Sequence, residues 1–263
     1  MFTRIYNAVL HWLRCVNDHS LHSPFLFNIY KNLIRRKYRD SDSIDNYLSS
    51  LKTNESILLI DDYGVGSSTL KSNSRRIKDI AKTSTSSLSI RKIIRNYIFQ
   101  NQPKCIIELG TNLGVTTMLM AESSLDYGGQ VYSFEGSNAL AELAERSFKD
   151  FNLGNIKIIK GDLDSTLDTT LATLDDKIDF VYMDANHTYE ATINYLNLIY
   201  PYLNENAAIL IGDIYWSKSM KKAWKEICSS GMFNTKLDFY HSGLILKGPN
   251  IPEEHEILMS RPL

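Results

Sequence analysis

The stretch CIIELGTNLGVTT, residues 105–117, decides the fold of this chain. Three apolar or small residues run into Glu108, and Gly110 and Gly114 then bracket a short turn. Two threonines follow where the start of a helix leaves backbone N–H groups unpaired. The pattern predicts a buried strand, a turn and a helix, and parallel sheets bind their ligands at the carboxyl ends of such strands. An ordinary strand-to-helix loop would look similar, so the rest of the chain has to separate the two interpretations.

Strand-like and helix-like segments alternate from residue 104 onward, which is typical of a parallel sheet with helices on both faces. Strands are expected at 104–109, 130–135, 156–160, 178–184 and 207–213, and helices at 115–125, 137–152, 164–174, 188–203 and 217–230. Residues 235–240 and 244–247 are joined by a link so short that these two strands must be antiparallel. The sequence therefore predicts an α/β fold, Rossmann-like and doubly wound, with a mostly parallel seven-stranded sheet and a C-terminal antiparallel hairpin.

The chain before this alternation is expected to be a mainly helical extension with a short β element. Residues 4–16 carry apolar side chains on one helical face, and Ser23 before a proline is a typical helix start. Ser86 and Ser87 are expected to cap a further helix, whose inner face carries Ile90, Ile93, Ile94, Tyr97 and Ile98. Residues 57–68 resemble a strand and a glycine-rich turn, but the sequence that follows is too polar for a helix packed on a sheet. We expect this segment to be a turn or lid that could touch a ligand. The predicted domains are an extension, 1–86, and a main domain, 87–263.

Length and composition restrict the class of protein. A chain of 263 residues can bury a full core, and a hydrophobic content of 43% argues against disordered and fibrous classes. No apolar run approaches the roughly 18 residues that span a bilayer, and neither a clean signal peptide nor a lipidation motif is recognised. Cys15, Cys105 and Cys228 are odd in number and widely scattered, which favours neither disulfides nor a metal knuckle. We expect a cytoplasmic protein without membrane association.

The net charge of -1 hides an asymmetry between the two parts of the chain. Residues 1–104 hold 17 Lys/Arg against 8 Asp/Glu, a net +9, and residues 105–263 hold 12 against 22, a net -10. Such a split can mark a nucleic-acid-binding half. The sequence lacks a basic stripe interleaved with aromatic residues of the kind that single strands need. Attraction between the two halves explains the asymmetry without a nucleic acid, so a small-molecule ligand is favoured.

Acidic residues follow all five predicted parallel strands, and the third of them lies two residues beyond its strand: Glu108, Glu135, Asp162, Asp184 and Asp213. A single acid after a strand is a common cap of the next helix. A row of acids along one sheet edge is harder to dismiss, because like charges repel unless a ligand or cation satisfies them. An acid after the second strand of a nucleotide-binding sheet is placed to accept hydrogen bonds from a ribose diol.

The glycine spacing of the first turn separates two classes of cofactor. Dinucleotide-binding loops follow G-x-G-x-x-G, in which the second glycine lets the backbone approach a pyrophosphate. Asn112 occupies that position here, and Gly110 and Gly114 remain with three residues between them. The loop therefore suits a nucleoside that lacks a pyrophosphate, and it favours S-adenosyl-L-methionine (SAM) over NAD.

Residues 87–247 resemble the class I SAM-dependent methyltransferases, with a first motif similar to that of small-molecule O-methyltransferases. The matching segments are ELGTNLGVTT (108–117), FE (134–135), GD (161–162), YMDANHTYE (182–190) and GDIYW (212–216). The terminal hairpin also agrees with the sheet of that family. The resemblance implies a transferase that moves a methyl group from SAM to a small-molecule acceptor, most simply to a hydroxyl oxygen.

The resemblance also implies the cofactor-binding residues. Glu108 and the turn after it would hold the methionine part, and Glu135 would bind the ribose hydroxyls. Asp162 would pair with the adenine amino group, and Asp184 would lie near the cofactor's amine or the transferred methyl. The complete implied set is Glu108, Gly110, Thr111, Asn112, Gly114, Glu135, Gly136, Asp162 and Asp184.

One departure from the family pattern concerns a metal ion. Catechol-type members bind a divalent cation through an Asp after the fourth strand and an Asp-Asn pair after the fifth. Asp184 and Asp213 match this pattern, but Ile214 stands where the Asn should be. Because hard cations need oxygen ligands, we expect no tightly held metal.

The candidate catalytic residues are His187, Asp184 and Asp213. A hydroxyl acceptor must lose its proton, so the enzyme mainly positions the partners and supplies a base. We hypothesise that His187 is this base, since histidine changes protonation near neutral pH; alternatively it caps the next helix. Asp213 is a second candidate base or an orienting acid. Tyr215 and Trp216 could wall the acceptor pocket, although core packing explains them equally well.

Two other classes of function stay open. The basic N-terminal half would suit RNA or DNA base methylation, but the sequence DANH at 184–187 differs from the Asn/Asp/Ser-Pro-Pro-aromatic motif of enzymes that methylate exocyclic amino groups. A non-catalytic cofactor-binding protein is the other alternative, and acids at every expected position count against it. The N-terminal helices could cover this subunit's own pocket or pair with a second chain in a homodimer.

Overall fold

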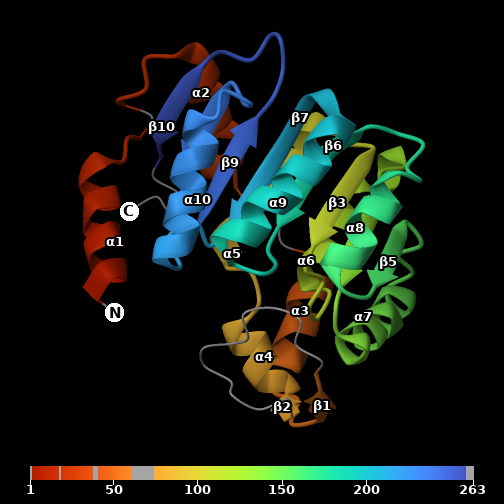
Figure 1. Ribbon diagram of the computed structural model, residues 1–263. Helices are drawn as coiled ribbons and strands as arrows, with labels where there is room; N and C mark the ends of the chain where they lie inside the picture. The colour runs from red at the N-terminus through yellow and green to blue at the C-terminus, as the bar shows by residue number, and fades with distance from the viewer. Residues whose placement is uncertain (1, 18, 38–40, 61–73, 259–263) are drawn as a thin grey trace. The chain divides into compact units, whose positions relative to one another are not determined.

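The computed structural model (Figure 1) describes residues 2–17, 19–37, 41–60 and 74–258. The chain divides into two compact units. One unit comprises residues 38–176, and the other combines residues 1–37 with 177–263. The glycine-rich part of the predicted turn or lid at 57–68 lies outside the described residues, from position 61 onward. The domain boundary expected after residue 86 stays a prediction.

Three parallel strands form the sheet of the 38–176 unit, in the order β3 (Cys105–Leu109), β4 (Gln130–Glu135) and β5 (Ile156–Lys160). All five residues of β3 are buried, as expected of a strand covered on both faces. The register places Leu109 beside Phe134. The carboxyl ends of β3 and β4 therefore meet at one edge of the sheet, and Glu135 lies next to the turn after β3.

Helices follow these strands in the predicted alternation: α6 (Val115–Ser124), with a 3-10 turn at Leu125–Tyr127, α7 (Asn138–Asp150) and α8 (Leu163–Leu171). All three contact β4, and α7 also contacts β5. Before β3 comes α5 (Leu88–Asn101), whose first turn is capped by the Ser87 hydroxyl. Its predicted inner face is buried, at Ile90, Ile93, Ile94, Tyr97 and Ile98.

The same unit begins with two helices and a small antiparallel hairpin. The helices are α3 (Asp42–Leu51) and α4 (Ile77–Thr83), which contact each other. The hairpin strands are β1 (Ile57–Leu59) and β2 (Ser74–Arg76), and they pair in antiparallel register. The short β element that the sequence predicts in this region is therefore present.

The other unit carries five strands in the order β10-β8-β9-β7-β6. β6 (Ile178–Met183) is parallel to β7 (Leu203–Gly212), and β9 (Ser242–Leu246) runs antiparallel between β7 and β8 (Thr235–Asp238). The predicted C-terminal hairpin is thus confirmed. An additional strand, β10 (Glu254–Ile257), lies parallel to β8. With it, the two units contribute eight strands besides the β1–β2 hairpin, rather than the seven predicted.

The hairpin turn differs from the predicted one at Ser242-Gly243. The chain turns at residues 239–241, where Tyr240 has a φ of 68°, and Ser242 and Gly243 already belong to β9. A Cβ on Gly243 would lie 2.4 Å from ring atoms of Trp224. This glycine therefore admits a buried indole to the face of the strand, and the positive φ falls on a tyrosine instead.

The helices of this unit are α9 (Tyr189–Ile199), followed by a 3-10 turn at Tyr200–Tyr202, and α10 (Lys218–Ser229), which packs beside α9 (Figure 1). From the N-terminus come α1 (Phe2–Arg14), α2 (Pro24–Ile29) and a π-helical segment at Tyr30–Arg35. Ser23 caps α2, as its sequence predicts. Every helix within the described part of the chain is too short or too polar to cross a bilayer.

The first helix shows an unexpected distribution of its side chains. Its apolar residues Val9, Trp12 and Leu13 are exposed, whereas His11 lies against Asp238 at 3.3 Å. Asn7 is buried and accepts a hydrogen bond from Lys221. Polar contacts thus anchor helix α1 within its unit, and Val9, Trp12 and Leu13 stay exposed.

Candidate functional site

The turn after β3 is fixed by one carbonyl oxygen. The N–H groups of Gly110 and Thr111 both donate to the carbonyl of Phe134, each at 3.0 Å. Gly114 begins α6 with a φ of 77°, in a region that favours glycine. A Cβ at this position would also lie 2.8 Å from Cε1 of Phe148. Two backbone hydrogen bonds therefore fix the turn against β4, and a glycine at the start of α6 leaves room for Phe148.

Glu135, at the end of β4, reaches across to this turn. Its Oε2 accepts a hydrogen bond from the backbone N–H of Asn112 at 2.7 Å, and its Oε1 accepts one from the N–H of Ser137 at 2.9 Å. Gly136 lies between the carboxylate and Ser137 in the chain. These two bonds orient the carboxylate of Glu135, a group to which ribose hydroxyls can donate hydrogen bonds.

Asn112 occupies the position where a dinucleotide loop would have its second glycine. It adopts a positive φ of 53°, which asparagine tolerates better than most residues. Its N–H is used by Glu135, and its side-chain amide donates to the carbonyl of Ser84 at 2.9 Å. A pyrophosphate would need to approach the backbone closely at this position. Here the Asn112 side chain occupies the turn, and the Asn112 N–H already donates to Glu135.

Glu108 is fully buried. Its Oε2 accepts hydrogen bonds from the hydroxyls of Thr117 and of Ser133, the latter at 2.5 Å. Thr111 joins the same network through a 2.6 Å hydrogen bond between its hydroxyl and that of Ser133. The carboxylate of Glu108 therefore ties β3 to the first turn of α6, through Thr117, and to β4, through Ser133.

Asp162 is the N-cap of α8, since its carboxylate accepts a hydrogen bond from the N–H of Asp164 at 3.3 Å. The common structural explanation for an acid after a strand therefore applies to Asp162. It does not apply to the other four acids, because the neighbouring helices α6, α7, α9 and α10 have their N-caps at Gly114, Ser137, Thr188 and Ser217. Among the five acids, capping by an acid side chain therefore accounts for Asp162 alone.

In the unit that contains residues 177–263, Asp184 follows β6. Its Oδ2 accepts a hydrogen bond from the hydroxyl of Tyr182 at 2.8 Å. Its Oδ1 lies over Gly212, where an added Cβ would approach it to 2.4 Å. Glycine at the end of β7 is therefore required for Asp184 to occupy this position.

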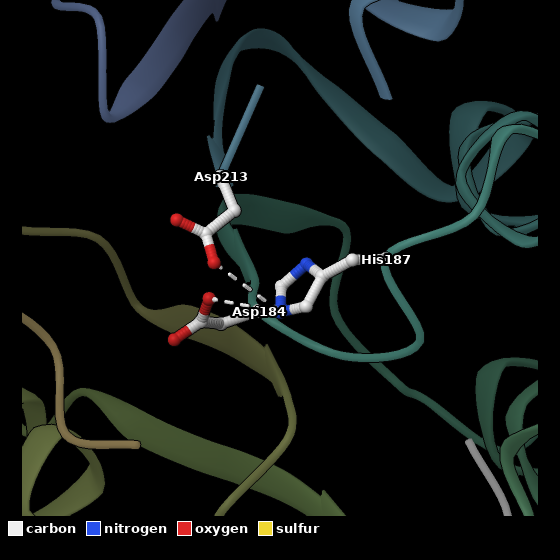
Figure 2. A group of neighbouring side chains, drawn as sticks. All are labelled: Asp184, His187 and Asp213. Atoms are coloured by element: carbon white, nitrogen blue, oxygen red, sulfur yellow. Dashed lines mark ion pairs between the residues drawn. The ribbon is translucent and has the colours of Figure 1, made fainter. Parts of the chain in front are cut away.

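His187 points back toward two carboxylates (Figure 2). Its Nε2 lies 3.8 Å from Oδ1 of Asp184 and 3.8 Å from Oδ2 of Asp213. The alternative that His187 caps the next helix is wrong, because Thr188 is the N-cap of α9 and accepts from the N–H of Ala191. The His187 imidazole therefore lies with Asp184 and Asp213 in one cluster. All three side chains of this cluster are partly exposed.

Asp213 is held by its backbone at the end of β7. It has a φ of 53°, its N–H donates to the carbonyl of His241 at 2.7 Å, and its carbonyl accepts from the N–H of Trp216 at 2.8 Å. This conformation turns the chain sharply and directs the carboxylate toward His187 (Figure 2).

The residues after Asp213 have separate roles. Ile214 is completely buried. The Tyr215 hydroxyl donates to Oδ2 of Asp238 at 2.6 Å, and its ring stacks on Tyr240. Burial and the Asp238 carboxylate raise the pKa of Tyr215 above its ordinary value. Structural bonding therefore accounts for Tyr215, whereas Trp216 is 39% exposed and stays a candidate for lining an acceptor pocket.

Sequence reasoning missed three supporting residues: Tyr182, Gly212 and His241. Tyr182 lies in the strand expected at 178–184, where a tyrosine two residues before an acid on one strand face can reach its carboxylate. Gly212 directly precedes the second acid, which is a recognisable sign of close packing. His241 acts through its backbone carbonyl, and no sequence signal could have identified it.

Parts of this chain are similar to known methyltransferases in sequence and in fold. Residues 107–214 match the family model described as a methyltransferase domain. A methyltransferase from Podospora anserina, solved bound to SAH, has a TM-score of 0.62 at 14% identity, with 88% of this chain and 97% of that chain covered. An O-methyltransferase from Bacillus cereus in complex with SAH has a TM-score of 0.60 at 15% identity, covering 80% of this chain and 92% of that chain.

A third solved structure is the O-methyltransferase TomG from Streptomyces achromogenes, involved in tomaymycin synthesis and solved in complex with SAM. Its TM-score is 0.54 at 17% identity, and the alignment covers 78% of this chain and 96% of that chain. These likenesses show the fold. The predicted α/β fold class and the resemblance to class I methyltransferases are confirmed.

Proposed function

We propose that this chain is a SAM-dependent methyltransferase acting on a hydroxyl oxygen of a small molecule, because residues 107–214 match the family model described as a methyltransferase domain. The observation that carries the proposal is the carboxylate of Glu135, oriented by two backbone N–H groups beside the turn after β3. A ribose diol is the partner that such a carboxylate suits. The solved relatives named above include proteins bound to SAH and SAM.

The residues of the 38–176 unit supply the cofactor contacts in this proposal. Glu135 and Gly136 bind the ribose, and the backbone of Gly110, Thr111, Asn112 and Gly114 receives the methionine part. Glu108 supports that backbone from a buried position, where it bonds Thr117 and Ser133. Asp162, which already caps α8, is proposed to accept a hydrogen bond from the adenine amino group with its remaining lone pairs.

The acceptor chemistry is assigned to Asp184, His187 and Asp213. The acceptor oxygen attacks the methyl carbon of the sulfonium, a C–O bond forms as the C–S bond breaks, and SAH leaves as a neutral thioether. The hydroxyl proton must go to a base, and lowering the cost of its removal is the task of these residues. An imidazole between two carboxylates can do this as a general base, which is the hypothesis drawn from the sequence.

Isothermal titration calorimetry tests the cofactor assignment. SAM and SAH should bind with one site per chain, and NAD should give no heat of binding. Hydrogen bonds to a charged group contribute about 1.5–3 kcal/mol, so Glu135→Gln should weaken SAM binding by about 10–100-fold. Glu142→Gln makes the same chemical change on the exposed side of α7 and is the matched control. NAD binding in preference to SAM, or equal SAM affinity in the two variants, would contradict the proposal.

We also propose the cellular compartment and the oligomeric state of the protein. Its three cysteines, Cys15, Cys105 and Cys228, are free, which supports a reducing cytoplasm.

A homodimer is supported by an exposed apolar face on α1, which a second copy of the chain would cover. This face consists of Val9, Trp12 and Leu13, with exposed fractions of 49%, 63% and 65%. A wild-type chain that sediments as a monomer at high concentration would argue against that dimer. Nucleic acid is not proposed as a partner.

A further inference from the structure

We infer that Asp238, at the end of β8, is a positioning residue for the proposed acceptor site, and that His11 on helix α1 acts on that site through it. The inference rests on the proposed function, in which Asp213 and His187 serve the acceptor. All of these residues belong to the unit that combines residues 1–37 with 177–263. The N-terminal helix thereby gains a part in the acceptor chemistry that its distance along the chain does not suggest.

The Asp238 carboxylate is almost completely buried, with 1% of the residue exposed, and donors surround it. Its Oδ2 accepts a hydrogen bond from the Tyr215 hydroxyl at 2.6 Å, and its Oδ1 accepts one from the backbone N–H of Tyr240 at 2.8 Å. Burying a carboxylate is costly unless hydrogen bonds or an ion pair satisfy it. These partners therefore hold Asp238 in one orientation.

His11 supplies a third partner of this carboxylate. Its Nε2 lies 3.3 Å from Oδ1 of Asp238 and 3.3 Å from the Asp238 carbonyl oxygen. Because both of these atoms are acceptors, a proton on Nε2 suits either of them. The His11 side chain is 9% exposed, and its ring packs edge-on against Tyr240 with the ring centroids 5.4 Å apart. A buried polar contact thus joins α1 to the end of β8.

Helix α1 approaches the same group of side chains a second time through Asn7. The buried Asn7 side chain accepts a hydrogen bond from Lys221 at 2.7 Å. The Nζ of Lys221 in turn lies 5.6 Å from the centroid of the Tyr215 ring. Residues four positions apart lie on one face of a helix, so Asn7 and His11 present a single polar face of α1 to this network.

Two short routes lead from Asp238 to Asp213. The first runs through Tyr215, which follows Asp213 by two residues and donates its hydroxyl proton to Asp238. The second runs through Tyr240, whose N–H bonds Asp238, and the next residue, His241. The carbonyl of His241 accepts a hydrogen bond from the N–H of Asp213 at 2.7 Å. The rings of Tyr215 and Tyr240 stack with centroids 5.4 Å apart, so a change at Asp238 reaches Asp213 by both routes.

Asp213 depends on this support because of its backbone conformation. Its φ of 53° lies in the left-handed region, which a residue with a side chain adopts at a cost unless its surroundings hold it there. Its Oδ2 lies 3.8 Å from Nε2 of His187 (Figure 2). A misplacement of about 1 Å, caused by a change far from the reacting atoms, can lower a rate by about 100-fold. Asp238 therefore acts on the acceptor site by fixing where the Asp213 carboxylate lies.

Amide hydrogen exchange of the full chain, followed by NMR, tests this coupling without an acceptor substrate. The reporters are the backbone amides of Asp213 and Trp216, which donate to His241 and to Asp213, since local opening of the turn exposes them to exchange. Networks of packed side chains transmit effects of about 2–30-fold, so His11→Ala should accelerate exchange of both amides by about that factor. It should also shift the NMR signals of the His187 ring, which faces Asp213. If His11 served only to anchor α1, exchange would become faster in α1 alone.

Two further variants identify the contact that carries the effect. Asp238→Asn replaces an acceptor oxygen with a donor and should accelerate exchange of the reporter amides by about 10–100-fold, the factor for losing one hydrogen bond to a charged group. His11→Gln keeps an N–H donor on a side chain of similar reach, so its exchange should stay close to that of the wild type.

The variant His255→Ala makes the same change as His11→Ala at an exposed histidine on β10 and is the matched control, with wild-type exchange expected at both reporters. Circular dichroism checks that each variant folds, and the two His11 variants carry the test if Asp238→Asn does not fold. Unchanged exchange at the Asp213 and Trp216 amides in His11→Ala overturns the proposal. Equal acceleration in His11→Ala and His11→Gln also overturns it, because the contact with Asp238 would then not carry the effect.

Failure of this coupling and failure of the proposed function are distinguishable. A chain that binds SAM, but in which His11→Ala leaves the Asp213 turn unchanged, retains the proposed function and loses Asp238 as a positioning residue. A chain that shows the coupling but does not bind SAM loses the methyltransferase assignment, and with it the role of Asp238 in methyl transfer.

Discussion

At the scale of single residues, the two acids that carry most of the account are oriented in different ways. Glu135 is held by backbone N–H groups of Asn112 and Ser137. Asp184 is held by the Tyr182 side chain and by the space above Gly212. Neither caps the helix that follows its strand. Fixing a carboxylate before the ligand arrives lowers the entropic cost of binding, so both residues are pre-organised for donors or cations.

A pH-dependent stability is expected from Tyr215. Because burial and the Asp238 carboxylate raise its pKa in the folded state, the folded chain keeps this proton when the unfolded chain has lost it. The contribution is therefore complete below the ordinary tyrosine pKa of about 10 and is lost as the pH rises above it. The free energy of unfolding of the wild type should fall more steeply between about pH 10 and 11 than that of Tyr215→Phe.

Urea unfolding at a series of pH values measures this difference. At neutral pH, Tyr215→Phe should also lose about 1.5–3 kcal/mol, because it removes a hydrogen bond to a carboxylate. Tyr202→Phe, in the 3-10 turn after α9, is the parallel control. Equal slopes for the two variants would show that the Tyr215–Asp238 bond does not set the alkaline stability.

At the scale of elements, the stability of the β3–turn–α6 segment depends on the glycine at position 114. Gly114 has both a positive φ of 77° and a close neighbour, Phe148, 2.8 Å from the position of an added Cβ. Gly128 has a positive φ of 73° with open space around it, and Gly154 has open space and no positive φ. These three positions separate the cost of backbone strain from the cost of crowding within one unit.

Alanine substitutions at these three glycines should therefore form a graded series. Gly154→Ala should change the free energy of unfolding by less than about 0.5 kcal/mol. Gly128→Ala should destabilise by about 1 kcal/mol through its backbone conformation alone, and Gly114→Ala by about 2–4 kcal/mol, because overpacking adds to that strain. Chemical denaturation measures all three. A Gly114→Ala variant no less stable than Gly128→Ala would contradict the packing of α6 against α7.

Most of the helices and strands could be predicted from the sequence. Hydrophobic runs and helix caps located β3 to β9 and α5 to α10 within a few residues, since periodicity and capping are local signals. β10 was missed because its sequence, Glu254 to Ile257, is mostly polar and the strand exists through pairing with β8. The hairpin turn was misplaced because the glycine needed by Trp224 resembles a turn signal.

At the scale of the whole molecule, the site could be predicted in outline. The acids after the strands were recognised because topology brings carboxyl ends of parallel strands to one edge. Their individual roles could not be predicted: the burial of Glu108, the capping by Asp162 and the return of His187 toward Asp184 and Asp213 depend on the folded geometry.

The central claim is that the edge formed by β3 and β4 binds the adenosyl part of SAM. A crystal structure of the chain with SAH tests it most directly. We expect the two ribose hydroxyls to donate to the Glu135 carboxylate at about 2.5–3.0 Å, with the amino acid part of the ligand against the backbone of Gly110 to Gly114. An SAH molecule bound elsewhere, or ribose hydroxyls that do not reach Glu135, would contradict the claim.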